Sequence, residues 1–167
     1  MSANADPKQV AIVTGGSSGI GLGITRALLE HGYSVVANSR SISKSKNLTP
    51  SGELVLVDGD IGKKQTAVKV VGAAVKHFGR LDLLVNNAGT YMPKPFTEYM
   101  PEDFESMIHT NVAGYFFVTQ QAVTQMRKQQ SGHIVSISTV LVDQPLAGAT
   151  ISLPVITKST IPAFSRH

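Results

Sequence analysis

The sequence has no cysteine among its 167 residues, and this absence excludes several kinds of chemistry. The chain forms no disulfide, supplies no thiolate to a metal ion and has no cysteine nucleophile. It also lacks any apolar run long enough to span a membrane. Its first residues, MSANADPKQ, contain no apolar stretch of the kind found in signal peptides. We therefore expect a soluble, cytoplasmic protein without a membrane partner and without a metal site.

Charge is also scarce, since only 16% of the residues are Asp, Glu, Lys or Arg. The net charge of +4 comes from single basic residues and short pairs such as Lys63-Lys64 and Arg127-Lys128, with no long basic run. This pattern gives little support to nucleic-acid binding, which stays a remote alternative. The hydrophobic content of 42% is typical of a globular protein, and the length fits a single domain over residues 1–167.

Short apolar runs alternate along the chain with longer segments that have helical spacing. The apolar runs predict five strands, near residues 10–13, 34–37, 54–57, 81–85 and 133–138. Helical spacing predicts two helices that end at Gly32 and Gly79, one long helix over about 101–128, and a last helix that begins near Ser152. The polar segment 39–52 is expected to be a mobile loop with little or no helix. This alternation indicates an α/β fold, a parallel sheet with helices on both faces.

A glycine-rich turn, TGGSSGIG, spans residues 14–21, directly after the first predicted strand. Gly15, Gly19 and Gly21 let the backbone take unusual dihedral angles and let a phosphate approach closely. The start of the next helix offers unpaired N–H groups and the positive end of the helix dipole to a pyrophosphate. The alternative is an ordinary strand-to-helix turn. The strand–turn–helix context favours a dinucleotide site.

Four motifs follow one another in a characteristic order. They are TGGSSGIG at 14–21, NNAG at 86–89, TNV at 110–112 and GHIVSIST at 132–139. Together they resemble the motifs of the short-chain dehydrogenase/reductase family. The resemblance implies a Rossmann-like, doubly wound parallel sheet with five strands in the order 3-2-1-4-5. It also implies that the chain binds a nicotinamide cofactor through Gly15, Ser17, Ser18, Gly19, Ile20, Gly21, Ser39, Arg40, Asp60, Ile61, Asn87, Ala88, Gly89 and Lys158.

The end of the second predicted strand bears on the choice of cofactor. A carboxylate there accepts hydrogen bonds from a free ribose 2′-hydroxyl, whereas an arginine pairs with a 2′-phosphate. The sequence has Asn38-Ser39-Arg40 and no carboxylate, which favours NADP and leaves NAD possible. The alternative for Arg40 is a solvated loop residue. Asp60, which the resemblance places at the adenine, could equally cap the following helix.

The resemblance also implies a set of catalytic positions. In the family a tyrosine supplies the proton, and a lysine four residues later lowers the tyrosine pKa and binds the nicotinamide ribose. A serine hydrogen-bonds the substrate oxygen, and a helical asparagine supports a proton relay. Asn111 and Lys158 match the asparagine and the lysine. Thr139 aligns with the serine, and Ser138 is the alternative.

Asn111 has a second, structural interpretation. It shares an apolar helix stripe with residues that include Phe104, Tyr115 and Val123. A buried amide needs hydrogen-bond partners, so Asn111 is expected to pin a strand or a water molecule. The two roles can coexist.

The match to Lys158 places the tyrosine position at Pro154. Proline has no ionisable group, but it fits the first turn of a helix, with Ser152 as a plausible cap. Tyr91, which follows the NNAG motif, is a weak alternative acid. We therefore expect little or none of the family's usual activity.

Chains of the resembled family continue well past the lysine, with two more strands and a substrate loop. The 167 residues are expected to be a truncated chain, a degenerate copy or part of something longer, with the fifth strand at an open sheet edge. The leading interpretation is an NADP-preferring oxidoreductase that acts on a small carbonyl or alcohol substrate and forms a homo-oligomer through its long helices. The main alternative is a non-catalytic nucleotide-binding or assembly module.

Overall fold

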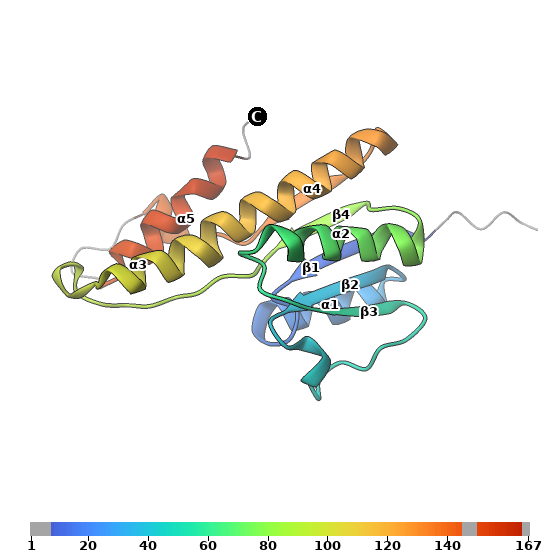
Figure 1. The fold of residues 1–167 in the computed structure, drawn as a ribbon, viewed down its shortest axis with the longest axis horizontal. Coiled ribbons are helices and arrows are strands. Elements are labelled where there is room, and N and C mark those ends of the chain that lie inside the picture. Colours follow the sequence, from blue (N-terminus) through green and yellow to red (C-terminus); the bar gives the residue numbers. More distant parts are fainter. Residues whose placement is uncertain (1–7, 145–149, 165–167) are drawn as a thin grey trace, which may run out of the picture.

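A computed structural model describes residues 8–144 and 150–164, which form a five-stranded sheet flanked by helices (Figure 1). The strand order is β3-β2-β1-β4-β5, and every pairing is parallel. This arrangement confirms the predicted doubly wound fold. The fourth and fifth strands are shorter than the apolar runs suggested. The strands are β1 (Val10–Thr14), β2 (Ser34–Ser39), β3 (Leu54–Asp58), β4 (Leu83–Asn86) and β5 (His133–Ser136).

Helices pack against both faces of the sheet. Side chains of α1 (Gly19–Glu30) pack on one face, and side chains of α2 (Lys64–Phe78) and α4 (Gly114–Gln129) pack on the other. The remaining helices, α3 (Pro101–Met107) and α5 (Ser152–Phe164), lie together beyond the sheet (Figure 1). Three short 3-10 turns cover Ile42–Lys44, Phe96–Glu98 and Val140–Val142.

The strands inside the sheet are mostly apolar because each of their faces borders a separate hydrophobic core. Alternate residues of β1 illustrate this, since Val10 and Ile12 face the core under α2 and α4, while Val13 faces the core under α1. All three side chains are fully buried. A parallel sheet covered on both faces requires such continuous apolar strands.

The long helix predicted over 101–128 contains an irregular turn that the sequence did not suggest. Between α3 and α4, residues Ile108–Ala113 form a π-helical turn. Such a turn is wider than an α-helical one and shifts the faces of the helix that follows it. The predicted apolar stripe is only partly buried, because Phe104 is 50% exposed and Val123 is 37% exposed.

The polar segment after β2 is packed against the domain. It contains only the 3-10 turn Ile42–Lys44, as expected, but Ile42 and Leu48 are buried in the core under α1. Ser43 is held by Asp58 at the end of β3, through its backbone N–H at 2.8 Å and through its hydroxyl. These contacts fix the start of a loop that contributes to the site described below.

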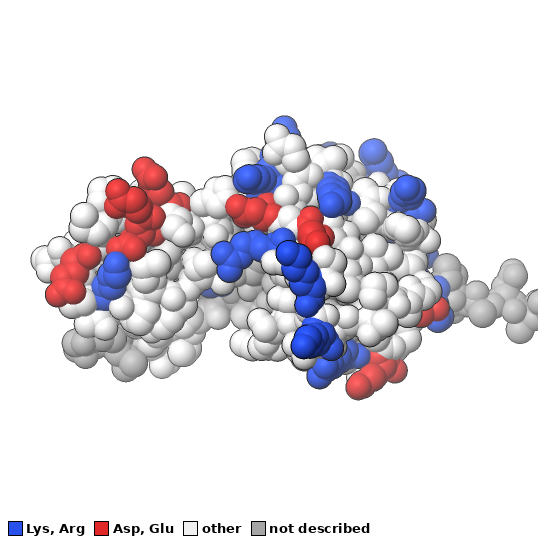
Figure 2. Space-filling model, turned by 60° about the horizontal axis from the view of Figure 1, so that its bottom comes forward, with Lys and Arg blue, Asp and Glu red and all other residues white. Residues whose placement is uncertain are grey.

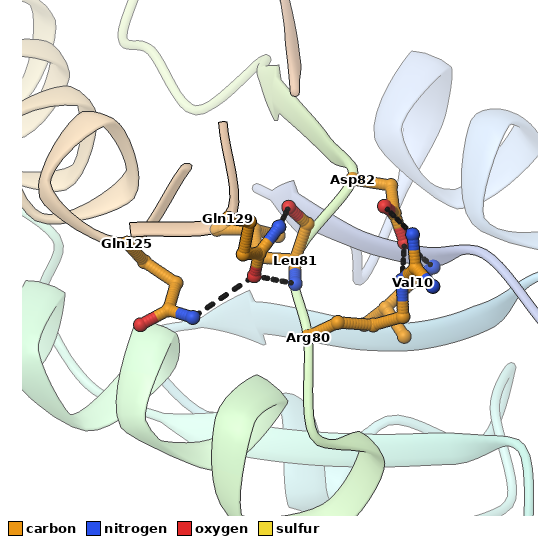
Figure 3. Close-up of polar contacts among 6 residues, drawn as sticks. All are labelled: Val10, Arg80, Leu81, Asp82, Gln125 and Gln129. Carbon is orange, nitrogen blue, oxygen red and sulfur yellow. Dashed lines mark hydrogen bonds and ion pairs between the residues drawn. The ribbon is translucent and has the colours of Figure 1, made fainter. Parts of the chain in front are cut away.

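Polar side chains fix the amino-terminal ends of the central strands (Figure 3). Asp82, which precedes β4, is buried and accepts a hydrogen bond from the Val10 backbone N–H at 2.8 Å. It also accepts hydrogen bonds from Arg80 Nε at 2.8 Å and from Arg80 Nη2 at 2.7 Å. A bidentate arginine compensates the cost of burying this carboxylate. The contact joins the starts of β1 and β4.

A second polar contact ties α4 to the same region (Figure 3). The Gln129 amide accepts a hydrogen bond from the Leu81 N–H at 2.9 Å and donates one to the Leu81 carbonyl at 2.8 Å. Gln125 donates a further bond to the Gln129 side-chain oxygen at 2.9 Å. Gln129 thus satisfies a buried peptide unit that no neighbouring strand reaches.

The far edge of the sheet is formed by β5. Its first three residues are exposed, including Ile134 and Val135, whose side chains point to opposite faces. This agrees with the expected open edge. In the described part of the chain, no helix is both long enough and apolar enough to cross a membrane.

The Gln129 contact leads to a prediction about stability. Replacing Gln129 by Ala leaves the buried N–H and C=O of Leu81 without partners, so the free energy of unfolding should fall by about 1–3 kcal/mol. Urea unfolding followed by circular dichroism measures this change. The matched control is Gln125→Ala, which removes one amide bond on the same helix and should cost less than about 1 kcal/mol. Equal losses in the two variants would contradict the assigned role of Gln129.

Candidate cofactor and active site

A large cavity lies at the carboxyl-terminal ends of the strands. Its volume is about 740 Å³. Turns that follow β1, β2, β3 and β4 form most of its wall, and α3 with the π-helical turn closes the remaining side. This is the position at which doubly wound sheets bind their ligands. The lining residues are Gly15, Ser17, Ser18, Gly19, Ile20, Asn38, Ser39, Arg40, Ser41, Gly59, Asp60, Ile61, Asn87, Ala88, Gly89, Thr90, Ser106, His109 and Thr110.

Most of the residues expected to bind the cofactor line this cavity. Gly21 and Lys158 do not line it. The lining also includes residues that the sequence analysis did not select, notably Ser106 and His109. No local signal marks these two, because their place in the wall depends on how α3 and the π-helical turn pack against the turn after β3.

The glycine-rich turn has the backbone geometry of a close approach. Gly15 and Gly19 have φ angles of +67° and +53°, which other residues rarely adopt. A Cβ at Gly21 would overlap the carbonyl oxygen of Gly15, so the turn closes tightly on the first turn of α1. Ser18, at the N-cap of α1, makes no side-chain capping bond, and the first turn carries no acidic residue. The N–H groups at this helix start therefore remain available to a ligand.

Thr14 joins the glycine-rich turn to the turn after β4. Its hydroxyl donates to the Val85 carbonyl at 3.3 Å and accepts from the backbone N–H groups of Asn87 and Ala88, both at 3.0 Å. The Asn87 side chain returns a bond to the Thr14 carbonyl at 2.9 Å. The Asn87 amide, expected at the cofactor, thus also holds the backbone of the cavity wall.

One side of the cavity is formed by the ends of β2 and β3. Asn38 is buried, and its amide nitrogen donates to the Val57 and Gly59 carbonyls at 2.9 and 3.1 Å, which ties the two strand ends together. Arg40 lies in the wall beside Ser39. Within the described ranges, Asp60 is the one carboxylate among the lining residues.

Asp60 does not cap α2, because the residue at the N-cap of that helix is Lys63. Its carboxylate instead accepts bonds from the Gly62 N–H at 3.0 Å and from His109 Nε2 at 2.9 Å. Burial raises the pKa of Asp60, but these two hydrogen bonds outweigh it, and the pKa lies below its usual value. The side chain is thus held as a carboxylate in the cavity wall.

Charge is unevenly distributed over the surface. In Figure 2 the acidic side chains gather mainly on the lobe at the left, while lysine and arginine side chains spread over the rest of the visible face. The sequence of α3 and the preceding 3-10 turn agrees, with Glu98, Glu102, Asp103 and Glu105 in this segment. The glycine turn and the ends of β2 are free of acidic residues, which suits a phosphorylated ligand.

Lys158 and Asn111 lie together beside the NNAG turn. A Cβ built on Gly89 would lie 3.1 Å from Lys158 Nζ and 3.2 Å from Asn111 Oδ1, so both polar groups approach the same backbone position. Lys158 Nζ donates to the Ile137 carbonyl at 3.0 Å. Burial lowers the pKa of Lys158.

The Asn111 side chain is fully engaged. Its oxygen accepts from the Thr90 N–H at 2.7 Å, and its nitrogen donates to the Thr90 carbonyl at 3.0 Å and to Thr157 Oγ1 at 2.9 Å. Asn111 is buried, as the apolar stripe predicted for a structural amide. It pins the turn after β4 to α5, and so places Lys158, the next residue after Thr157.

The two candidate hydroxyls lie outside the large cavity. Ser138 is exposed, and Thr139 Oγ1 accepts a bond from the Leu141 N–H at 3.4 Å. Ile137, directly before them, carries the carbonyl that binds Lys158. The end of β5 therefore lies close to Lys158, and both Ser138 and Thr139 stay candidates for the substrate-oxygen donor.

Pro154 is buried in the first turn of α5. Its carbonyl accepts a hydrogen bond from the Thr157 hydroxyl at 3.0 Å, so the residue shapes the helix start. Tyr91, the weak alternative acid, is exposed and does not line the large cavity.

Known proteins are similar to this chain in sequence. A family model described as short chain dehydrogenase matches residues 9–151. YtkK of Bacillus subtilis, an oxidoreductase by name, is 36% identical over 134 residues, which are 75% of this chain and 52% of the relative. An uncharacterized oxidoreductase of Staphylococcus aureus is 33% identical over 135 residues, 79% of this chain and 58% of the relative. The chain thus spans about half the length of these curated relatives.

Solved structures agree with the sequence matches. "ElxO with NADP Bound" superposes with a TM-score of 0.82 at 29% identity, covering 94% of this chain and 65% of that one. A short-chain dehydrogenase/reductase from Serratia marcescens superposes with a TM-score of 0.81 at 28% identity, covering 93% and 68%. With the fold, the glycine-rich turn and the family match in agreement, this chain belongs to the short-chain dehydrogenase family.

Proposed function

We propose that this chain binds NADP in the large cavity and belongs to an oxidoreductase that acts on a small carbonyl or alcohol compound. The observation that carries the proposal is the cavity itself, in which the glycine-rich turn and Arg40 line one continuous space. The residues fit the cofactor. Glycine at position 21 keeps side-chain atoms out of the turn, which leaves room for a pyrophosphate, and the start of α1, which has no side-chain cap, offers N–H donors to it. ElxO, of similar structure, is described with NADP bound.

The preference for NADP rests on Arg40. It lines the cavity at the end of β2, where a carboxylate would repel a 2′-phosphate. Asp58, the nearby carboxylate at the end of β3, is bonded to Ser43 and does not line the cavity. Its pKa is lowered, chiefly by the hydrogen bond from the Ser43 hydroxyl. At the end of β2 the charged group that meets the ribose is therefore a guanidinium, while the Asp60 carboxylate after β3 is engaged by Gly62 and His109.

Lys158 and Asn111 support the reaction end of the proposal. When bound, the nicotinamide supplies or accepts the hydride. Lys158 would hold the nicotinamide ribose, since its ammonium lies beside Gly89 and donates to Ile137. Ser138 or Thr139 would donate to the substrate oxygen from the strand end next to that carbonyl. Asn111 would hold the backbone around both.

The proton that must accompany the hydride has no donor at position 154. Pro154 shapes the first turn of α5 and carries no ionisable group. General acid catalysis contributes on the order of 100-fold to 10,000-fold to such reactions. We therefore infer that the chain binds the cofactor and turns over substrate slowly or not at all. The second candidate function, a non-catalytic nucleotide-binding or assembly module, also rests on Pro154.

A homo-oligomer is the proposed assembly. Phe116 and Val123, both more than one-third exposed, line a groove of about 550 Å³ along α4. Sedimentation at several concentrations should show a dimer or tetramer, and Val123→Glu should shift it towards monomer because a buried charge would lack a partner. The matched control is Val68→Glu on α2, which is also exposed. A monomer at every concentration would exclude this assembly.

The cofactor preference gives a further prediction. Replacing Arg40 by Asp should weaken NADPH binding about 10-fold to 100-fold, because a charge-assisted bond is lost and a repulsion is gained. Binding of NADH should stay equal or become tighter. Fluorescence titration with both nucleotides measures the change.

The matched control for charge is Arg26→Asp. Arg26 is exposed, donates to the Asn47 carbonyl and does not line the cavity. If Arg26→Asp weakens NADPH binding as much as Arg40→Asp does, the effect is one of net charge, and the assignment of Arg40 is wrong.

Restoring the acid tests the catalytic part. A Pro154→Tyr variant should raise turnover of a ketone and aldehyde panel by about 100-fold or more, if the acid is what is lacking. Both forms are assayed with the C-terminal segment of YtkK appended, because this chain spans only 52% of that relative. Adding Lys158→Met to the variant should remove the gain, since the tyrosine then lacks its cation. Ordinary turnover by the unsubstituted form would contradict the inferred low activity.

A further inference from the structure

A hydrogen bond between two side chains from separate turns lies in the wall of the large cavity. Asp60 lies in the turn between β3 and α2, and His109 lies 49 residues later in the π-helical turn. His109 Nε2 is 2.9 Å from Asp60 Oδ2. Both residues line the cavity, and the side chain of His109 is 43% exposed and that of Asp60 is 34% exposed. The contact is thus within reach of a ligand.

The contact orients the carboxylate through both oxygens. Gly62 N–H occupies Oδ1, and His109 occupies Oδ2. Because a carboxylate only accepts hydrogen bonds, the histidine must carry its proton on Nε2. Each carboxylate oxygen accepts more than one bond, so both keep capacity for a donor on the ligand. Two fixed donors leave the side chain one orientation.

The space for the histidine ring is built into the chain. A Cβ at Gly62 would overlap both the His109 ring and the His109 carbonyl oxygen. Glycine is therefore required for the ring to reach Asp60. The same glycine donates to the other carboxylate oxygen, so one residue both admits the histidine and completes the hold on Asp60.

We propose that His109 is a positioning residue for the adenosine half of the cofactor, acting through Asp60. The inference rests on the proposed NADP binding and adds to it the residue that orients the carboxylate at the ends of β2 and β3. His109 precedes Asn111 by two residues on the same π-helical turn. The wall that meets the adenosine half is therefore continuous with the wall that holds Thr90 and α5.

The test measures binding of 2′-phospho-AMP and of NADPH to the 167-residue chain. His109→Ala should weaken both ligands by the same factor, about tenfold, because the lost bond acts on the half that they share. His109→Gln, which keeps an N–H donor, should bind within about threefold of the unsubstituted chain. His77→Ala, which removes an exposed histidine of α2 that does not line the cavity, is the matched control and should bind normally.

A double-variant cycle separates positioning from general support of the fold. Asp60→Asn and His109→Ala together should bind no more weakly than Asp60→Asn alone, because His109 acts through Asp60. Additive losses, unchanged binding in His109→Ala, or failure of His109→Gln to restore binding in a chain that melts normally would each overturn the inference. If the unsubstituted chain binds neither ligand, the proposed function fails with it.

Discussion

The hydroxyl of Thr14 is the contact on which the site depends most. It lies at the end of β1, where the strand order turns from β2 on one side to β4 on the other. One donated and two accepted hydrogen bonds use the full capacity of this hydroxyl. The glycine-rich turn and the NNAG turn are thereby fixed to each other. Both turns line the cavity, so this hydroxyl fixes two parts of its wall relative to each other.

The opposite ends of the same strands are fixed by independent means. Asp82 joins the starts of β1 and β4. Gln129 joins α4 to Leu81, the residue before Asp82. These contacts lie far along the strands from the cavity, so they hold the sheet without competing with a ligand. A rigid sheet with open turns at one end is the arrangement that lets loops carry function.

The residues beside the NNAG turn and at the start of α5 differ in what holds them. Lys158 is held partly buried, at an electrostatic cost that its lowered pKa reflects, and Asn111 satisfies three polar groups around it. A lysine kept in such a place is expected where a ligand benefits from it. Pro154, one helical turn earlier, serves the helix alone. The contacts of Lys158 and the helix start at Pro154 are thus built by separate residues.

The sequence by itself determined the order of strands and helices, the glycine-rich turn and most of the cavity lining. Local periodicity and backbone preference decide the elements and the turn, and they act over a few residues. The lining residues were indicated by the resemblance of four motifs to the short-chain dehydrogenase/reductase family. The tertiary structure alone decided the π-helical turn, the exposure of Phe104 and Val123, and the burial of Ile42 within a polar loop. It also decided that His109 meets Asp60 and that Lys158 meets Ile137. These contacts join residues 49 and 21 positions apart, and no local pattern carries that information, because only the packing of separate elements brings the two partners together.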